Sequence, residues 1–121
     1  MWVIDSGCSA HISPHREWFK TFHEFCTPTN TRLGNGDAIE AIGAGTIAIK
    51  QGNLLNSHLL PELAANLFSV SAALDNKLAC SATDKSINFY LNDERVLEGW
   101  HVYNAPGYYC TRTRSANGHE A

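Results

Sequence analysis

After Met1 the chain starts with the run Trp2-Val3-Ile4-Asp5-Ser6-Gly7, and the interpretation of the later residues depends on it. Three bulky apolar residues, two of them β-branched, predict a strand that is buried on both faces. A carboxylate, a hydroxyl and a glycine then follow in direct succession. Because a desolvated carboxylate is costly unless partners compensate it, Asp5 is an expensive residue to place there. We interpret Asp5 as a catalytic carboxylate that is presented by a strand-to-loop turn.

Composition restricts the class of protein. The chain has 121 residues, of which 44% are hydrophobic and 17% charged, as in an ordinary globular domain. The net charge of −3 argues against a nucleic-acid-binding module. No apolar run approaches the roughly 18 residues that span a bilayer, so we expect no membrane association. Four cysteines at irregular spacing favour a reduced, intracellular and cytoplasmic protein over a disulfide framework.

The pattern of residues predicts a small all-β domain at 2–110, followed by a flexible polar tail at 111–121. Strand-like runs occupy 29–33, 38–42 with its continuation 43–50, 54–60, the first part of 66–75, 78–82, 86–91, 95–97 and 102–109. A short helix through Leu74 is expected, with Ser69 or Ser71 as its N-cap. The aromatic residues Trp18 to Phe25 are interpreted as core, in a helical turn or an irregular segment. Seven or eight short strands indicate a closed β-barrel or a sandwich.

The residues Gly34-Asn35-Gly36-Asp37 separate two strand-like runs. An Asn-Gly pair in this setting is the strongest short-range signal of a β-hairpin. Its glycine content favours a hairpin that opens and closes. An ordinary tight turn would explain the same residues.

The ordered set of motifs resembles the aspartic protease of Ty1/copia-type retrotransposon polyproteins, which is a relative of the retroviral proteases. The likeness extends over residues 2–110. It rests on 2–12 (WVIDSGCSAHI), 33–37 (LGNGD), 43–46 (GAGT), 59–61 (LLP), 66–71 (NLFSVS) and 107–109 (GYY).

This resemblance implies a homodimeric endopeptidase of the retropepsin type that cleaves its own Gag-Pol polyprotein, within the cytoplasm or virus-like particles. By this match Asp5 is catalytic, Ser6 hydrogen-bonds across the dimer axis, and Gly7 leaves room around the carboxylates. The hairpin Gly34, Asn35, Gly36 and Asp37 is the flap over the peptide, and the strand at 67–68 runs behind the active-site loop. Retroviral members usually carry glycine after that strand, where this chain has Ser69.

The chemistry of such a site follows from two carboxylates in close contact. They cannot both ionise, so one keeps a proton while the other activates a shared water. The chain offers one aspartate in a suitable setting, so catalysis requires a second copy of the chain. No metal and no other cofactor is needed in this mechanism.

Other interpretations of the same residues stay open. Taken alone, the Asp-Ser-Gly triplet favours a turn carboxylate at Asp5 that caps nearby amides. Cys8, His11, His23 and Cys26 have a spacing close to that of zinc-binding motifs, which predicts a zinc-stabilised binding module as the alternative. Against zinc, His11 is better explained as a structural hydrogen-bonding residue that braces the loop after Gly7. A third interpretation is a domesticated, catalytically silent dimerisation or peptide-binding module.

Overall fold

The computed structural model describes residues 1–34, 36–101 and 109–113, which form ten strands and one short α-helix. The strands are β1 (Trp2–Asp5), β2 (Ile12–Ser13), β3 (Phe19–Arg32), β4 (Ala38–Ile49), β5 (Gly52–Leu59), β6 (Asn66–Ser69), β7 (Ala79–Ala82), β8 (Ser86–Leu91), β9 (Glu94–His101) and β10 (Tyr109–Thr111). The helices are the 3-10 turn η1 (Arg16–Trp18) and α1 (Val70–Asp75). The chain is thus mostly β, as its sequence predicts.

The strands make one mixed sheet in the order β3-β4-β5-β2-β6-β1-β10-β9-β8-β7. Strand β1 runs parallel to β6 on one side and antiparallel to β10 on the other. The register pairs Ile4 with Phe68 and Asp5 with Ser69, so β1 ends beside the start of α1. The strand at 67–68 therefore runs directly beside the one that delivers Asp5.

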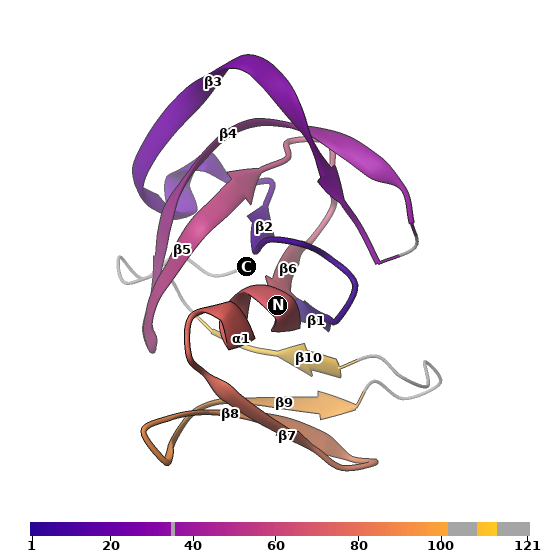
Figure 1. The fold of residues 1–121 in the computed structure, drawn as a ribbon, viewed down its shortest axis with the longest axis vertical. Coiled ribbons are helices and arrows are strands. Elements are labelled where there is room, and N and C mark those ends of the chain that lie inside the picture. The colour runs from indigo at the N-terminus through magenta and orange to yellow at the C-terminus, as the bar shows by residue number, and fades with distance from the viewer. Residues whose placement is uncertain (35, 102–108, 114–121) are drawn as a thin grey trace.

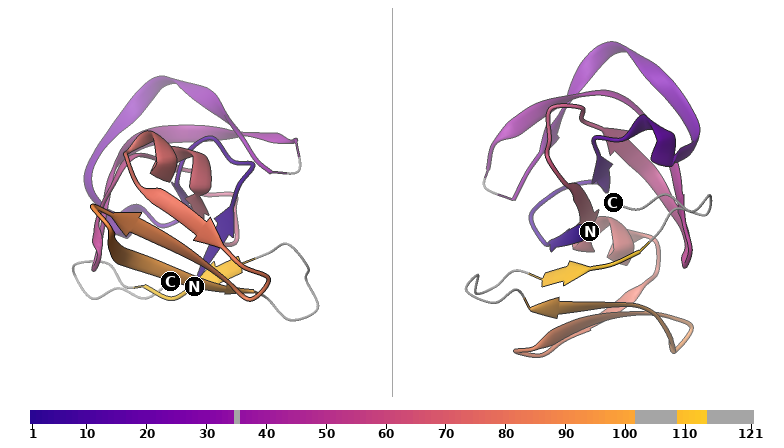
Figure 2. Two further views of the ribbon diagram at one scale, coloured as in Figure 1. Left: turned by 60° about the horizontal axis from the view of Figure 1, so that its bottom comes forward. Right: turned by 180° about the vertical axis from the view of Figure 1, so that it is seen from behind.

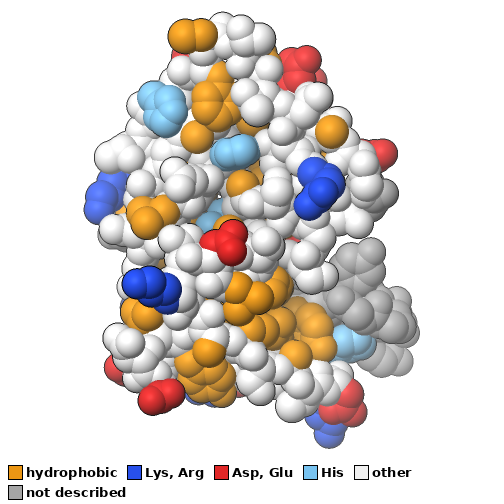
Figure 3. All heavy atoms as spheres, viewed as in Figure 1, with side chains coloured by type: hydrophobic (Ala, Val, Ile, Leu, Met, Phe, Trp, Pro, Cys, Tyr) orange, Lys and Arg blue, Asp and Glu red, His pale blue; other side chains and the backbone are white. Residues whose placement is uncertain are grey.

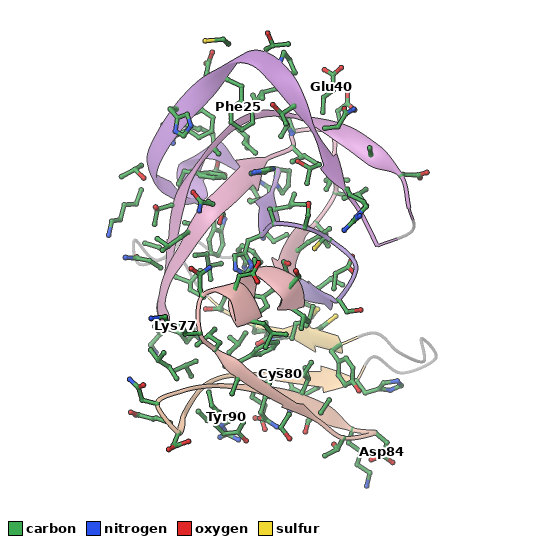
Figure 4. All side chains as sticks on the ribbon, in the orientation of Figure 1. Phe25, Glu40, Lys77, Cys80, Asp84 and Tyr90 are labelled. Carbon is green, nitrogen blue, oxygen red and sulfur yellow. The ribbon has the colours of Figure 1, made fainter. Side chains whose placement is uncertain are left out.

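The molecule has two regions, as the ribbon views show. The long strands β3 and β4 arch over one end of the molecule, while β7, β8 and β9 form the other end (Figures 1 and 2). Side-chain positions agree: Phe25 and Glu40 lie at the arched end, and Asp84 and Tyr90 at the opposite end (Figure 4). Strand β1 and helix α1 lie between the two ends. The turn after β1 is consequently held from several sides.

The buried side chains form two clusters, of which the larger spans both regions. The larger core surrounds Trp2, whose ring meets Trp18 edge-on at 5.6 Å, and it extends to Phe68 and Phe89. The smaller core lies under the arch of β3 and β4 and centres on Cys8, Ile12, Ala41 and Leu60. Because Cys8 and Ile12 flank the loop after β1, this loop is anchored in the smaller core.

The aromatic run after Pro14 forms a 3-10 turn and then the first part of β3. The spacing of three residues between Phe19 and Phe22 looks helical in the sequence. In the structure a bulge between Phe19 and Thr21 supplies the extra residue, so both rings reach the same side and meet at 5.4 Å. Packing of the partly buried Phe22 against the buried Phe19 is thus achieved in a strand and not in a helical turn.

The expected closure of the barrel is not found. In the sheet order of the described residues, β3 and β7 stand at opposite ends and do not pair with each other. The hairpin of β3 and β4 instead arches over one end of the molecule, as Figure 1 shows. Thr111, the first residue of the expected tail, is buried in β10 opposite Trp2. The expected strand at 102–108 lies outside the described residues.

The surface is mixed in character. Figure 3 shows hydrophobic side chains reaching the surface around α1 and the strands beneath it, while charged side chains are scattered. Within the described parts, no helix has the length and apolar character needed to cross a membrane.

Candidate functional site

The carboxylate of Asp5 caps its own turn. Its Oδ1 atom accepts a hydrogen bond of 2.7 Å from the backbone N–H of Gly7, the arrangement of an Asx turn. The Asp5 side chain is half-buried, whereas Ser6 is exposed. The strand β1 ends here because Asp5 turns the backbone away from the ladder with β6. This contact is the one that the turn-carboxylate interpretation of Asp5 predicts.

The β3–β4 hairpin reaches back to this turn. Its tip is closed by hydrogen bonds from Leu33 N to the Asp37 carbonyl and from Gly36 N to the Leu33 carbonyl, 2.8 and 3.1 Å long. A third bond, from Ser9 N to the Arg32 carbonyl, ties the hairpin to the loop. The sequence prediction of a hairpin is therefore confirmed, although Asn35 lies outside the described residues.

Two glycines allow the hairpin tip to lie against the Asp5 turn. A Cβ atom added to Gly7 would lie 2.5 Å from the Cα atom of Gly34. One added to Gly34 would lie 2.5 Å from the Asp5 Oδ1 atom. Both distances are shorter than real Cβ contacts, so side chains at these positions would push the hairpin away. The structure thus brings Asp5, Gly7 and Gly34 together, while Gly36, with φ +90°, only supplies the turn.

His11 holds the loop after β1 in place. Its Nδ1 atom accepts a hydrogen bond of 3.0 Å from Ser69 N, and its ring packs on Phe68 at 4.7 Å. Ser69 also donates from its hydroxyl to the Cys8 carbonyl at 2.8 Å. Burial lowers the pKa of His11 to about 4, because the charged ring would be desolvated. The predicted structural role of His11 is confirmed, and the ring is neutral with its proton on Nε2.

The thiol of Cys8 is buried and unreactive. Burial, followed by the negative charge of Asp5, raises its pKa to about 11. The thiolate is the nucleophilic form of cysteine, so Cys8 is a poor nucleophile at neutral pH.

The zinc alternative is wrong. His23 and Cys26 are exposed on β3, whereas Cys8 and His11 are buried in the loop, and His11 uses Nδ1 for Ser69. Across the described ranges, no three His, Cys, Asp or Glu side chains converge in the way that a metal ion requires. Sequence spacing misled because β3 is extended, which carries His23 and Cys26 away from the loop.

A second histidine, His58, lies half-buried under the arch of β3 and β4. His58 Nδ1 is 2.6 Å from the hydroxyl of Thr31, and its ring meets that of Phe25 edge-on at 5.9 Å. The backbone N–H of His58 donates to the carbonyl of His11. Through these contacts β5 connects the loop after β1 to the C-terminal end of β3.

Comparison with known proteins decides the family. The family model described as the β-barrel domain of the Pol polyprotein matches residues 2–78, which is more than half of the chain. The chain belongs to this family. It is also 33% identical over 69 residues to the putative transposon Ty5-1 protein of Saccharomyces cerevisiae (strain ATCC 204508 / S288c). That alignment covers 57% of this chain and 47% of the relative, so the chain spans about half of the relative's length. No solved structure matches.

The family match corrects the assignment from resemblance. The chain belongs to the family of Pol polyprotein β-barrel domains and not to the protease domain, so the prediction of an aspartic endopeptidase is wrong. The polyprotein context inferred from the motifs agrees with the match at this coarser level. The Asp-Ser-Gly turn misled because a capped turn and a catalytic turn need the same residue types.

One exposed feature of this Pol β-barrel domain has no counterpart in the sequence reasoning. Trp100 on β9 is 52% exposed. It pairs across the sheet with Cys110 on β10, which pairs in turn with Val3 on β1. Residues that face each other in a ladder share one side of the sheet, so these three form a row on the outer face. Alternation in the run Glu98-Gly99-Trp100 was the sequence signal from which the exposure of Trp100 could have been predicted.

Proposed function

We propose that this domain is a non-catalytic accessory part of a Ty-type Pol polyprotein that associates with a second copy of itself. The observation that carries the proposal is Trp100, an aromatic side chain exposed by half on an ordered strand. Tryptophan is enriched among the few residues that supply most of the binding energy at protein interfaces. The row of Trp100, Cys110 and Val3 is called the Trp100 face below.

The surroundings of Trp100 support a protein partner. A shallow hollow of about 270 Å³ lies beside it, lined by Met1, Cys110 and Arg112 among others. Arginine is also enriched at interfaces, and the lining atoms are mostly apolar, although His101 and Thr111 also line the hollow. A tryptophan beside a hollow can insert into the equivalent hollow of a second copy, which is the self-complementary geometry of a two-fold dimer.

Neither edge strand of the sheet is a better candidate surface for self-association. Strand β3 has a long outer edge, but its ladder with β4 is interrupted twice and it contains Pro28. Bulges and proline are devices that prevent edge-to-edge pairing. Strand β7, at the other end, has only four residues. The Trp100 face is therefore the better candidate surface.

The positions of the first and last strands indicate what self-association would achieve. Trp2 on β1 and Thr111 on β10 are paired neighbours, so the chain enters and leaves the domain side by side. Two associated copies would hold the flanking parts of two polyprotein chains near each other. All four cysteines of the chain are free, which suits the reducing interior of a cell as the setting.

The proposal predicts that Trp100→Ser weakens self-association. Sedimentation velocity of the whole chain across the micromolar range should show a monomer–dimer equilibrium, and Trp100→Ser should raise its dissociation constant about tenfold or more. Leu74→Ser is the matched control, because Leu74 is 50% exposed but lies on α1.

Two results would contradict this proposal. One is a monomer at every concentration. The other is an equal dissociation constant for the unmodified chain and Trp100→Ser. A dissociation constant raised by Ser6→Ala instead would place the contact at the Asp5 turn.

A further inference from the structure

Two prolines of the chain directly follow a residue with a hydroxyl group, in Ser13-Pro14 and Thr27-Pro28. A hydroxyl residue followed by proline is the minimal pattern that a proline-directed protein kinase recognises. The sequence does not distinguish the two positions, whereas the structure does. Ser13 is fully buried in β2, and its hydroxyl donates to Asn66 Oδ1. A kinase would reach Ser13 only after the centre of the sheet had unfolded.

Thr27 has the opposite surroundings. Both Thr27 and Pro28 are exposed. The carbonyl of Thr27 accepts a hydrogen bond of 3.4 Å from the hydroxyl of Thr29, but the Thr27 hydroxyl itself has no hydrogen-bond partner among the described residues. It is therefore free to react without the loss of an internal contact.

The backbone around Thr27 is also released from the sheet. Strand β3 stands at one end of the sheet order and forms the outer arch in Figure 1. Its ladder with β4 stops at the pair of Glu24 with Gly43 and resumes at the pair of Thr29 with Ala41. Residues 25–28 thus stand opposite a single residue of β4 and lie outside the ladder. A kinase can take hold of this stretch without breaking a regular pairing.

Proline fixes the form that such an enzyme binds. The residue before a proline is restricted to extended backbone, which is how a kinase holds its substrate. Proline also lacks an N–H group, so a kinase pocket with no acceptor at that point selects proline over other residues.

We infer that Thr27 is a phosphorylation site for a proline-directed protein kinase. The base of the kinase takes the hydroxyl proton while Thr27 Oγ1 forms a bond to the γ-phosphorus of ATP. The bond from that phosphorus to the bridging oxygen breaks, and ADP leaves.

The added phosphate would stay on the surface. Neither residues 24–30 nor strand β4 contains a lysine or an arginine, and the nearest charge along β3 is that of Glu24. A phosphate orders a segment when cations pair with it, and it is repelled by carboxylates. The phosphate would therefore remain hydrated and open to an arginine-rich site on another protein. Phosphorylation marks the arch and leaves its fold unchanged.

The test is incubation of the whole chain with a mitogen-activated protein kinase and ATP, followed by intact-mass and fragment-mass measurement. One phosphoryl group is expected, at Thr27. Thr27→Val keeps the branched shape and should abolish incorporation. Pro28→Ala should lower the initial rate about tenfold or more, because the kinase complex would then bury an unpaired N–H. Thr29→Val is the matched control, since Thr29 is exposed on the same strand but is followed by Asn30.

A peptide of residues 24–30 separates recognition from accessibility. If the kinase phosphorylates this peptide but not the chain, the segment is not accessible in the fold and the inference fails. It also fails if neither is phosphorylated, if the phosphoryl group is found at Ser13, or if Pro28→Ala reacts at the unmodified rate. Because Thr27 on β3 is far in the sheet order from Trp100 on β9, Thr27→Val should leave self-association unchanged, and the two proposals are tested independently.

Discussion

A few buried side chains hold the loop after β1 in place, and His11 is central among them. It accepts a hydrogen bond from Ser69 N with a ring nitrogen that must stay unprotonated. Protonation would turn this acceptor into a donor that faces another donor. The surrounding core, which includes Phe68, also makes a charged ring costly.

The stability of the domain should therefore fall in mild acid. The folded state lowers the pKa of His11 from 6.5 to about 4, so the unfolded chain binds the proton more readily. The free energy of unfolding has its full value above pH 6.5 and decreases as the pH falls towards 4, by about 3 kcal/mol in total. His58, whose pKa burial also lowers, adds to the decrease. Urea unfolding at a series of pH values measures it.

The control is His11→Asn, whose Oδ1 atom can still accept from Ser69 N but does not titrate. This variant should lose most of the pH dependence between pH 6.5 and 4. If its pH dependence equals that of the unmodified chain, His11 is not the responsible group.

Among the elements, α1 depends most on a single cap. The helix has only six residues, too few to be stable in isolation, and it begins directly after β6. Ser69 accepts from Ala72 N at 3.0 Å as its N-cap and donates to the Cys8 carbonyl. One hydroxyl thus joins the helix to the loop that follows Asp5.

Removal of this hydroxyl should loosen both segments. We expect Ser69→Ala to lower the free energy of unfolding by about 2 kcal/mol, from the lost cap and the unpaired Cys8 carbonyl. Hydrogen exchange at Ala72 should accelerate more than exchange in β8. Ser71→Ala, at an exposed position of the same helix, should change stability little. Equal effects of the two substitutions would contradict the assigned cap.

At the scale of the whole molecule, stability comes from packing and not from cross-links. All four cysteines are free, and no metal-binding cluster is found among the described residues. The two cores, around Trp2 and around Ile12, supply the buried apolar surface.

The thermal midpoint should thus be unaffected by a reducing agent or by a zinc chelator. Calorimetric scans of the purified chain with and without each reagent measure this. A lower midpoint with the reductant would indicate a disulfide in solution. A lower midpoint with the chelator would restore the zinc module as a hypothesis.

The elements that sequence predicted well are those with local causes. Strand β8 has the predicted bounds, the Asn-Gly hairpin forms, and α1 begins at one of the two serines expected to cap it. Each depends on residues a few positions apart, so the sequence alone was sufficient.

Other features depend on which distant segments meet. The bulge that makes β3 a strand, the linear sheet order, and the placing of Gly34 against Asp5 arise from pairings between distant segments. The Asp-Ser-Gly turn shows the limit most clearly, since its local chemistry suits both a cap and a catalyst. The sequence determined the mostly β character, the hairpin and the capped helix. The tertiary structure alone decided the sheet order, the exposed Trp100 and the accessibility of Thr27, because contacts between distant segments are not encoded in any local pattern.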